Sequence, residues 1–316
     1  MPLSYFVCEH CGFWQRHFAP AACPVCEDFR HPLPPDGWRF TPARAVAART
    51  RCCVEEVLPG LLMVTADPPV GIGPAGYLLQ TPNGNVAFEG CGWYSDAALD
   101  ALADAGGARW ASASHPHVYG ALWRVCERFG AELVLHQADL AFAKALPVAW
   151  AYDDAVELAP GVTLRHTGGH TPGHTVLVWE RSGDTTLFCG DALKYTVDAR
   201  GAATTVSTHL AFDADLPLTH AMVRRYRDVL GPVDAGAVVT PWEVVAAGGM
   251  PAARALFDRQ LAGRPFTDRL VLGAGGVPTG ERVPERAWRR AHGAGRVVDA
   301  PPTGAVVASS LTSPIP

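Results

Sequence analysis

The sequence predicts an α/β fold in which two sheets are flanked by helices. Short apolar runs that suit strands alternate with segments that suit helices, and this alternation recurs along the chain. Loops at the strand ends of such a fold converge on one edge, where we expect the functional residues. With 316 residues, 48% of them hydrophobic and 18% charged, the chain is long enough for one sizeable domain and a small appendage.

The first half of the main domain contains a hairpin signal and a well-marked helix. Asn83-Gly84 lies between two apolar runs, which is typical of a β-hairpin. Ser95 is a good N-cap residue, and the pair Gly106-Gly107 ends the helix that it begins. We predict strands at 61–65, 76–80, 86–88, 110–113 and 132–135, and helices at 96–105, 119–129 and 138–146.

The second half continues with strands and then helices, and composition marks the domain boundaries. We predict strands at 162–166, 175–179 and 185–188, and helices near 218–230 and 252–261. A proline-rich connection at 31–36 cannot continue regular structure. The predicted organisation is a module at 1–35, a linker at 36–50, a main domain at 51–275 and a largely disordered tail at 276–316, with a helical turn or two near 284–292.

Three histidines in two motifs indicate a metal site. His115 and His117 flank Pro116 at the end of an apolar run, and in an extended segment residues i and i+2 point the same way. The third, His170, lies in the motif Gly-Gly-His-Thr-Pro-Gly-His-Thr at 168–175. Zn²⁺ suits imidazole, and three protein nitrogens leave a position for water, so these residues predict a hydrolytic centre.

The order of HxH, then GHTPGHT, then Gly-Asp at 190–191 resembles the metallo-β-lactamase superfamily, which includes hydroxyacylglutathione hydrolases, lactonases, ribonucleases and flavodiiron proteins. The resemblance covers roughly residues 51–270 and implies a four-layer αββα sandwich. By position it makes His115, His117 and His170 metal ligands and Asp191 a bridging carboxylate. It also makes Glu89 a strand-end acid that orients the site by hydrogen bonds, and it gives His174 at most a supporting role of the same kind.

The chain departs from the family pattern at the second metal. Where the usual HxHxDH motif has its aspartate and last histidine, this sequence has Tyr119 and Gly120. The family's late histidine is also missing, and Trp242 or Glu243 falls near its place. The resemblance, with these departures, implies one ion, most simply Zn²⁺, in the main domain.

The favoured function is a metal-dependent hydrolase that acts on a small-molecule ester, thioester, lactone or related electrophile through a metal-bound hydroxide. Asp191 would bind the metal or orient the water. The hypothesis for Tyr119 is a hydrogen bond to a developing oxyanion, and the alternative is simple packing. The chain has no GxSxG motif, which argues against a serine hydrolase.

Four N-terminal cysteines predict a second metal site. Cys8 and Cys11 form one CxxC pair, and Cys23 and Cys26 form another. Four thiolates close a tetrahedral site, so its role is structural or electron transfer rather than hydrolysis. The pattern resembles rubredoxin-like modules and short zinc ribbons, and it leaves Zn²⁺ and iron open. Disulfides are the less favoured alternative, because the chain shows no secretory signal.

Two further functions remain open from these motifs. One is a redox protein in which iron in the four-cysteine module passes electrons to iron in the main domain, although no flavin-binding domain follows. The other is a non-catalytic, metal-stabilised module that binds a partner protein. The intact histidine motifs argue against this last function, and the missing second-metal ligands argue for it.

Charge and hydropathy limit the classes of partner that we expect this chain to bind. A net charge of −5 without a Lys/Arg run argues against nucleic acid, so we expect a small-molecule substrate. No apolar run approaches the length of a membrane span, which argues against membrane insertion. The N-terminal residues lack the basic region and cleavage site of a secretory signal, so the expected location is the cytoplasm.

Overall fold

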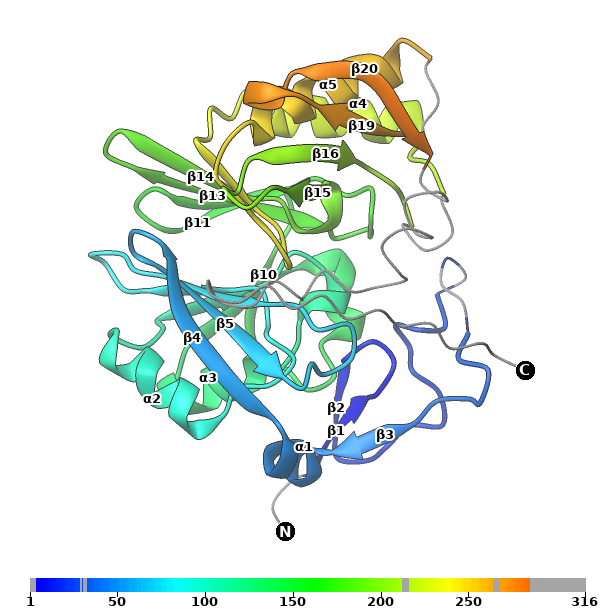
Figure 1. The fold of residues 1–316 in the computed structure, drawn as a ribbon. Coiled ribbons are helices and arrows are strands. Elements are labelled where there is room, and N and C mark those ends of the chain that lie inside the picture. Colours follow the sequence, from blue (N-terminus) through cyan, green and yellow to red (C-terminus); the bar gives the residue numbers. More distant parts are fainter. Residues whose placement is uncertain (1–3, 29, 31–32, 212–215, 264–267, 285–316) are drawn as a thin grey trace.

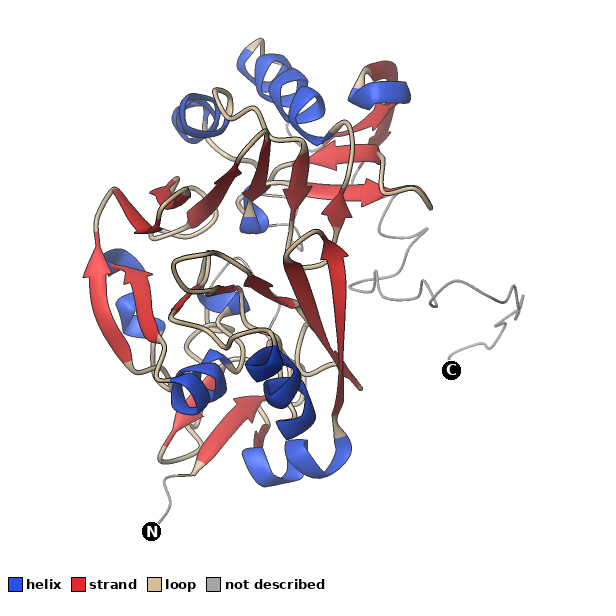
Figure 2. Ribbon diagram, turned by 90° about the vertical axis from the view of Figure 1, so that its left-hand side faces the viewer, coloured by secondary structure: helices blue, strands red, loops and turns tan. Residues whose placement is uncertain are grey.

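The computed structural model describes residues 4–28, 30, 33–211, 216–263 and 268–284. Two sheets face each other, and helices cover the outer face of each (Figure 1). A view from a second side shows the same order, with strands in the middle and helices at both ends of the molecule (Figure 2). The predicted α/β class and the αββα sandwich are therefore confirmed.

The first main sheet has seven strands in the order β10-β9-β8-β7-β6-β5-β4. The strands from β7 to β10 are parallel, and those from β4 to β7 pair antiparallel. Their bounds are β4 (Arg51–Leu58), β5 (Leu61–Asp67), β6 (Gly76–Leu79), β7 (Val86–Phe88), β8 (Trp110–Ser112), β9 (Glu132–His136) and β10 (Val148–Tyr152).

The second main sheet has six strands in the order β11-β12-β13-β14-β17-β18. Only the β14 to β17 pair is parallel, because the chain leaves the sheet between them and returns through a helix. The bounds are β11 (Ala155–Ala159), β12 (Val162–His166), β13 (Thr175–Arg181), β14 (Asp184–Phe188), β17 (Ala237–Val239) and β18 (Val244–Val245).

Alternation of side chains along the strands builds three apolar layers. In β6, Tyr77 and Leu79 enter the core between the sheets, whereas Leu78 enters the core under the helices of the first sheet. In β13, Leu177 likewise faces the other sheet and Val178 faces the helices of its own side. Since successive strand residues point to opposite faces, both faces of each sheet are buried.

Five α-helices are present in the described residues, and side chains cap two of them. They are α1 (Ala43–Arg49), α2 (Asp96–Asp104), α3 (Leu122–Phe129), α4 (His220–Leu230) and α5 (Gly249–Leu261). The Ser95 hydroxyl accepts from the Ala98 amide at the start of α2, as the sequence predicts. Thr219 does the same for the Met222 amide of α4. Each cap satisfies an amide that the helix leaves unpaired.

Two predicted helices are shorter than expected. The segment 138–146 forms only a 3₁₀ stretch, η2 (Gln137–Phe142), and the chain then enters β10, which the sequence analysis missed. The helix predicted from Tyr119 starts at Leu122, because residues 116–118 form a separate 3₁₀ turn, η1 (Pro116–Val118). The proline in η1 and Gly120, whose φ is +45°, separate the two.

Regular structure occupies part of the predicted linker and part of the predicted tail, and a further sheet lies at the end of the main domain. The predicted linker 36–50 contains β3 (Phe40–Pro42) and α1, and β3 pairs with β1 (Tyr5–Cys8), which also pairs with β2 (Trp14–Arg16). A four-stranded sheet consists of β15 (Lys194–Val197), β16 (Ala203–Ser207), β19 (Asp268–Leu272) and β20 (Pro278–Pro284), with β15 next to β16 and β19 between β16 and β20. Because β20 lies past 275, order extends into the predicted tail; the turns predicted near 284–292 and the rest of that tail lie outside the described residues.

The part of the chain from residue 4 to residue 30, which we call the N-terminal segment, packs on the main domain through aromatic rings. The Tyr5 ring stacks on Trp123 at 3.8 Å between centroids, and its hydroxyl donates to Glu127 Oε1 at 2.6 Å. The Trp14 indole N–H donates to the Gly92 carbonyl at 3.2 Å. Stacked aromatics bury large areas, so this interface fixes the segment against α3. Among the described residues, no helix is long and apolar enough to cross a lipid bilayer.

Candidate metal centre

The predicted ligands come from three loops that meet at one edge of the two sheets. His115 follows β8, and His117 lies in η1. His170 belongs to the loop at 167–174 between β12 and β13, which we call the His170 loop. Asp191 lies in the 3₁₀ turn η3 (Gly190–Ala192) directly after β14. Neighbouring strands of two facing sheets thus deliver all four side chains to the same place, which we call the histidine centre.

The distances within the histidine centre suit a metal ion. One ring nitrogen from each of the three histidines lies within 4.8 Å of the others. Asp191 Oδ2 is 3.6 Å from Nε2 of His115 and 3.5 Å from Nε2 of His170. These separations exceed a normal hydrogen bond. They are close to the edge of a tetrahedron around Zn²⁺, where ligand atoms at 2.0–2.1 Å from the ion are about 3.3 Å apart.

Burial keeps His115 in the form that binds a metal. Its side chain is fully buried, and no described group forms a hydrogen bond with its Nε2. Burial holds the pKa of His115 well below its usual range, and the charges of His170, His174 and His117 act in the same direction. A neutral imidazole with a buried, unpaired nitrogen is a ready ligand. His170 is 2% exposed, whereas His117 and Asp191 are partly exposed and mark the open side.

The sequence analysis gave the wrong reason for the convergence of His115 and His117. His115 has extended backbone, with φ −167° and ψ 169°, but His117 belongs to η1 and not to a strand. Pro116 begins this turn, where its fixed φ suits the first position of a helix. The two imidazole rings are 5.5 Å apart between centroids. The prediction that they share a site is supported, while the strand geometry behind it is wrong.

Glu89 supports His115 through Ser114. The Glu89 carboxylate accepts from the Ser114 amide at 2.9 Å, and the Ser114 hydroxyl is 2.8 Å from His115 Nδ1. Burial raises the pKa of Glu89 to about 8, and hydrogen bonds from Ser114 oppose that rise. With Nε2 as the ligand atom, Nδ1 carries the proton and donates it to Ser114. Glu89 thus holds the Ser114 backbone and the Ser114 hydroxyl contacts the ring, an arrangement similar to the acid-supported histidines of metal sites.

His174 lies beside the ligands. Its Nδ1 is 2.7 Å from the Thr167 hydroxyl, and burial lowers the pKa of His174 to about 3. Its Nε2 points toward Gly190, where an added Cβ would lie 2.8 Å from that nitrogen and 2.4 Å from Ser114 Oγ. Gly190 also has a φ of +51°, so its small size and left-handed backbone both let Asp191 reach the centre. The supporting role of His174 stays a prediction.

Two residues that the sequence analysis missed hold the His170 loop. The buried Asp139 carboxylate accepts from the Thr171 hydroxyl at 2.8 Å and from the Gly173 amide at 3.0 Å. The Tyr226 hydroxyl accepts from the His170 amide at 3.0 Å. Asp139 is distant in sequence and stands in what reads as an ordinary helical segment, so no local pattern marks it. Its role emerges only from the fold.

Replacing Asp139 by alanine is expected to weaken metal binding at the histidine centre by about 10-fold or more, the cost typical of lost outer partners of a ligand. The change also leaves two donors of the His170 loop without their acceptor, which costs about 1–3 kcal/mol each when they stay buried. Competition with a chelator measures the first effect, and denaturant unfolding measures the second. Asp153→Ala, at an exposed carboxylate nearby, should change neither; equal affinity in both variants would contradict the role of Asp139.

Comparison with known proteins identifies the family. A family model described as the metallo-β-lactamase superfamily matches residues 97–263, more than half of the chain. The chain belongs to the metallo-β-lactamase superfamily. The uncharacterized protein YmaE of Bacillus subtilis (strain 168) is 25% identical over 206 residues, which cover 62% of this chain and 74% of that protein.

Solved structures similar to this chain include VMB-1 and the DIM-1 metallo-β-lactamase. VMB-1 is 14% identical, with a TM-score of 0.49, and the match covers 66% of this chain and 98% of that one. DIM-1 is 13% identical, with the same TM-score and the same coverage.

The backbone leaves no room for a side chain where the superfamily's HxHxDH motif has its last histidine. Gly120 stands where the HxHxDH motif has its last histidine, and a Cβ there would lie 2.2 Å from the Gly90 carbonyl oxygen. Tyr119, at the aspartate's place, is buried. Burial is the main cause that raises the pKa of its phenol, and the charges of Asp139, Tyr152 and Glu89 raise it further. These neighbours are not the three ligands, and an oxyanion role for Tyr119 stays a prediction.

The segment that the sequence analysis placed near the superfamily's late histidine makes hydrogen bonds of its own. The Trp242 indole donates to the Ile72 carbonyl at 3.4 Å, and the amide of Glu243 donates to the Thr240 hydroxyl at 2.8 Å. Burial raises the pKa of Glu243 to about 7. Both residues therefore have contacts that do not involve the histidine centre.

Glu243 predicts a pH-dependent stability. Its folded pKa of about 7 lies above the ordinary 4.5, so the folded chain keeps a proton that the unfolded chain loses. Stability should therefore fall as pH rises from about 4.5 to about 7. Glu243→Gln removes this loss, and its gain in free energy of unfolding over the natural chain should be larger at pH 8 than at pH 4. Glu180→Gln, at an exposed site, is the control; an equal gain at both pH values would refute the prediction.

The four N-terminal cysteines form a second cluster, which we call the four-cysteine cluster. Sγ of Cys8 is 3.8 Å from that of Cys26, and Sγ of Cys11 is 3.6 Å from that of Cys23. All four sulfurs lie within 4.8 Å of one another and are buried. Sulfurs at about 2.3 Å from a tetrahedral ion are about 3.8 Å apart, so the cluster fits one ion. All four are free thiols, which removes the disulfide alternative.

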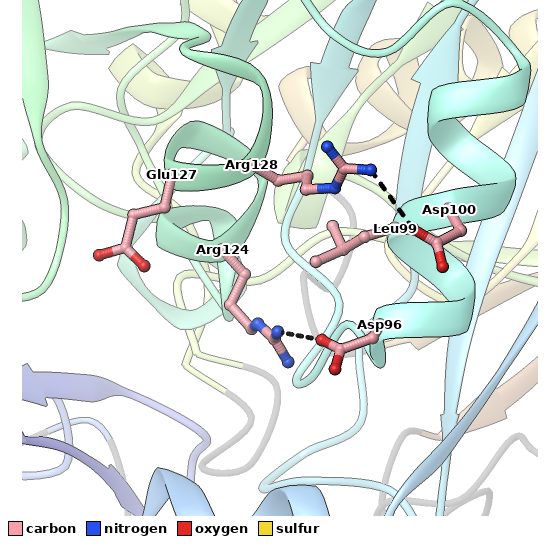
Figure 3. Close-up of a pocket in the computed structure, with 6 residues that line it drawn as sticks. All are labelled: Asp96, Leu99, Asp100, Arg124, Glu127 and Arg128. Carbon is pink, nitrogen blue, oxygen red and sulfur yellow. Dashed lines mark hydrogen bonds and ion pairs between the residues drawn. The ribbon is translucent and has the colours of Figure 1, made fainter.

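A surface hollow of about 300 Å³ lies elsewhere, between α2 and α3 (Figure 3). Ion pairs join its walls, with Arg124 2.6 Å from Asp96 and Arg128 3.3 Å from Asp100. The carboxylates are largely exposed, and exposed pairs of this kind contribute little to stability or to recognition. None of its lining residues belongs to the loops of the histidine centre.

Proposed function

We propose that the protein is a metal-dependent hydrolase that acts on a small-molecule ester, thioester, lactone or related electrophile. The observation that carries this proposal is the convergence of His115, His117 and His170 on one point beside the Asp191 carboxylate. Imidazole and carboxylate donors favour Zn²⁺ as the ion. Membership of the superfamily supports a hydrolytic reaction, since hydrolysis is the common chemistry of this donor set.

When bound, the ion would lower the pKa of water toward neutrality and would polarise the electrophile. The chain's own residues do the rest. Glu89 and Ser114 fix the His115 ring with Nε2 toward the centre. Asp191 Oδ2, between His115 and His170, is placed to accept a hydrogen bond from the attacking water and to orient it.

One ion, rather than two, is part of the proposal. The backbone contact between Gly90 and Gly120 leaves no room for a ligand side chain at position 120. A single ion held by His115, His117 and His170 would supply both effects at one point, which suits a carbonyl electrophile. The net charge of −5 supports a small molecule rather than a nucleic acid as the substrate.

We assign a structural role to the four-cysteine cluster, with Zn²⁺ as the simplest ion. Four buried thiolates leave no open position for substrate. The nine cysteines are all free, which supports a reducing compartment such as the cytoplasm. Iron at this cluster would give a red protein and favour the redox alternative, whereas zinc leaves the protein colourless.

A substrate screen with metal reconstitution tests the proposed hydrolase. Protein stripped by a chelator and reloaded with Zn²⁺ would be assayed against esters, thioesters, lactones and phosphodiesters. We expect hydrolysis of one class that appears with the ion and disappears with the chelator. A chain that binds Zn²⁺ at the histidine centre but hydrolyses none of these classes would contradict the proposal and favour the non-catalytic binding module.

A further inference from the structure

Arg30 connects the four-cysteine cluster to the histidine centre. It follows Cys26, the last cysteine of the cluster, by four residues, and it is only 6% exposed. Its guanidinium Nη1 donates to the backbone carbonyl oxygen of His170 and, at 3.0 Å, to that of Leu210. An arginine of the N-terminal segment thus contacts the backbone of a predicted metal ligand.

The guanidinium is held rigidly on its other edge. Asp28 accepts from Arg30 Nε at 2.9 Å and from Nη2 at 2.6 Å, and it also accepts from the Arg30 amide at 3.1 Å. A buried charge is costly unless it is paired and hydrogen-bonded. Here one edge of the planar group meets a carboxylate and the other meets two carbonyl groups, which only the arginine fork can do. The hydrogen bonds to Asp28 therefore hold the guanidinium in the orientation that contacts His170.

His170 is held on both sides of its backbone, and the two supports come from different parts of the chain. Tyr226 of α4 accepts from the His170 amide, and Arg30 donates to the His170 carbonyl. The Gly169 backbone lies against the Tyr226 ring, where an added Cβ would be 2.6 Å from the hydroxyl. The main domain thus fixes one side of the peptide, and the N-terminal segment fixes the other.

A second contact joins the loop of the four-cysteine cluster to the main domain. A Cβ on Gly71 would lie 2.1 Å from the amide nitrogen of Gly12, the residue after Cys11. This close approach of two backbones fixes the cysteine loop against the connection between β5 and β6. The segment carrying Arg30 therefore cannot move freely while the cluster is intact.

We propose that Arg30 is a positioning residue that makes metal binding at the histidine centre depend on the four-cysteine cluster. An ion in the cluster fixes the chain at Cys26, the fixed chain places Arg30, and Arg30 holds the His170 loop in ligating position. This inference rests on the metal centre of the proposed function, but not on hydrolysis. It predicts a linkage between two metal sites that occupy different parts of the fold.

The test compares Arg30→Gln with Arg39→Gln. Arg39 is also near the four-cysteine cluster, but its side chain is 72% exposed and pairs with Glu9 at 3.3 Å. Co²⁺ serves as the probe, because thiolate ligands give it a charge-transfer band that imidazole ligands do not. We expect Arg30→Gln to lower the affinity of the histidine centre by about 10–100-fold, with the thiolate band unchanged. Arg39→Gln should bind like the natural chain.

Cys26→Ser tests the direction of the linkage. Loss of the cluster should lower the metal affinity of the histidine centre as Arg30→Gln does. The double variant should bind the metal there as tightly as the single variant with the lower affinity. Multiplied losses would overturn the linkage, because the two changes would then act independently. Equal affinity of Arg30→Gln and the natural chain at the histidine centre would overturn the role of Arg30.

Two further outcomes separate this inference from its alternatives. If Arg30→Gln also loses the thiolate band, Arg30 is only an anchor of the N-terminal segment, and the inference fails. Arg30→Lys keeps the charge, and recovery of native circular dichroism without recovery of affinity would support the role of the fork. The metal affinity is measured without substrate. If the natural chain hydrolyses nothing, but Arg30→Gln still lowers the metal affinity of the histidine centre, only the proposed function is refuted.

Discussion

His170→Ala is expected to remove the ion from the histidine centre and to lower hydrolysis by more than about 100-fold, beyond the cost of losing an outer partner of a ligand. The remaining histidines, His115 and His117, cannot alone complete a tetrahedral site. His170 is also buried, so alanine offers no donor and bulk solvent does not readily reach the vacated position. Metal content per chain and the rate with the best substrate of the screen measure the two effects.

The matched control for this prediction is His220→Ala. His220 is an exposed residue at the start of α4, remote in sequence from the three ligands. It should keep both the metal content and the rate of the natural chain. If His170→Ala retained the ion and the rate, the assignment of the histidine centre would be wrong, and the Arg30 inference would fail with it.

With metal at a concentration that saturates the histidine centre, Cys23→Ser is expected to cost the one metal equivalent of the four-cysteine cluster and to unfold the N-terminal segment. Binding of a structural Zn²⁺ to small modules provides about 10–16 kcal/mol. A segment of this size has too little apolar surface to replace that contribution. Its aromatic contacts would then be lost, and Trp93 and Trp123, which surround Trp14, would become exposed. Limited proteolysis within residues 4–28 and a red shift of tryptophan emission measure the change.

Cys53→Ser provides the comparison, because Cys53 is an exposed cysteine of β4 outside the four-cysteine cluster. It should keep metal content, protease resistance and emission. A Cys23→Ser chain with the natural protease pattern would show that the aromatic interface alone holds the segment. The structural role of the cluster would then have to be abandoned.

The sequence was sufficient for the fold class and for the residues of both clusters, because each depends on short motifs. His170 and the Gly-Asp pair at 190–191 lie in loops whose glycines are required by close contacts, so pattern and geometry coincide there. Helix α2 was predicted correctly because its cap is local: the Ser95 hydroxyl accepts from the amide of Ala98, three residues later. Local chemistry of this kind can be read directly from residue order.

Features that depend on distant partners could not be predicted. Asp139 and Arg30 act on the His170 loop from 32 and 140 residues away, and neither has a neighbouring residue that marks it. Strand β20 was taken for tail because the chain becomes rich in Gly, Pro and Ala there, yet β20 pairs with β19. The 3₁₀ turn at His117 was missed for a different, local reason, since a short turn and a strand end differ little in sequence.

The contact between Gly90 and Gly120 limits how this chain can change its chemistry. The family's usual ligand at position 120 cannot return by a single codon change, because a side chain there collides with the main chain of the neighbouring loop. Two loops would have to separate first, and the strand end that carries Glu89 would shift with them. A designer who wants a two-ion enzyme from this scaffold must therefore rebuild the backbone before choosing any ligand.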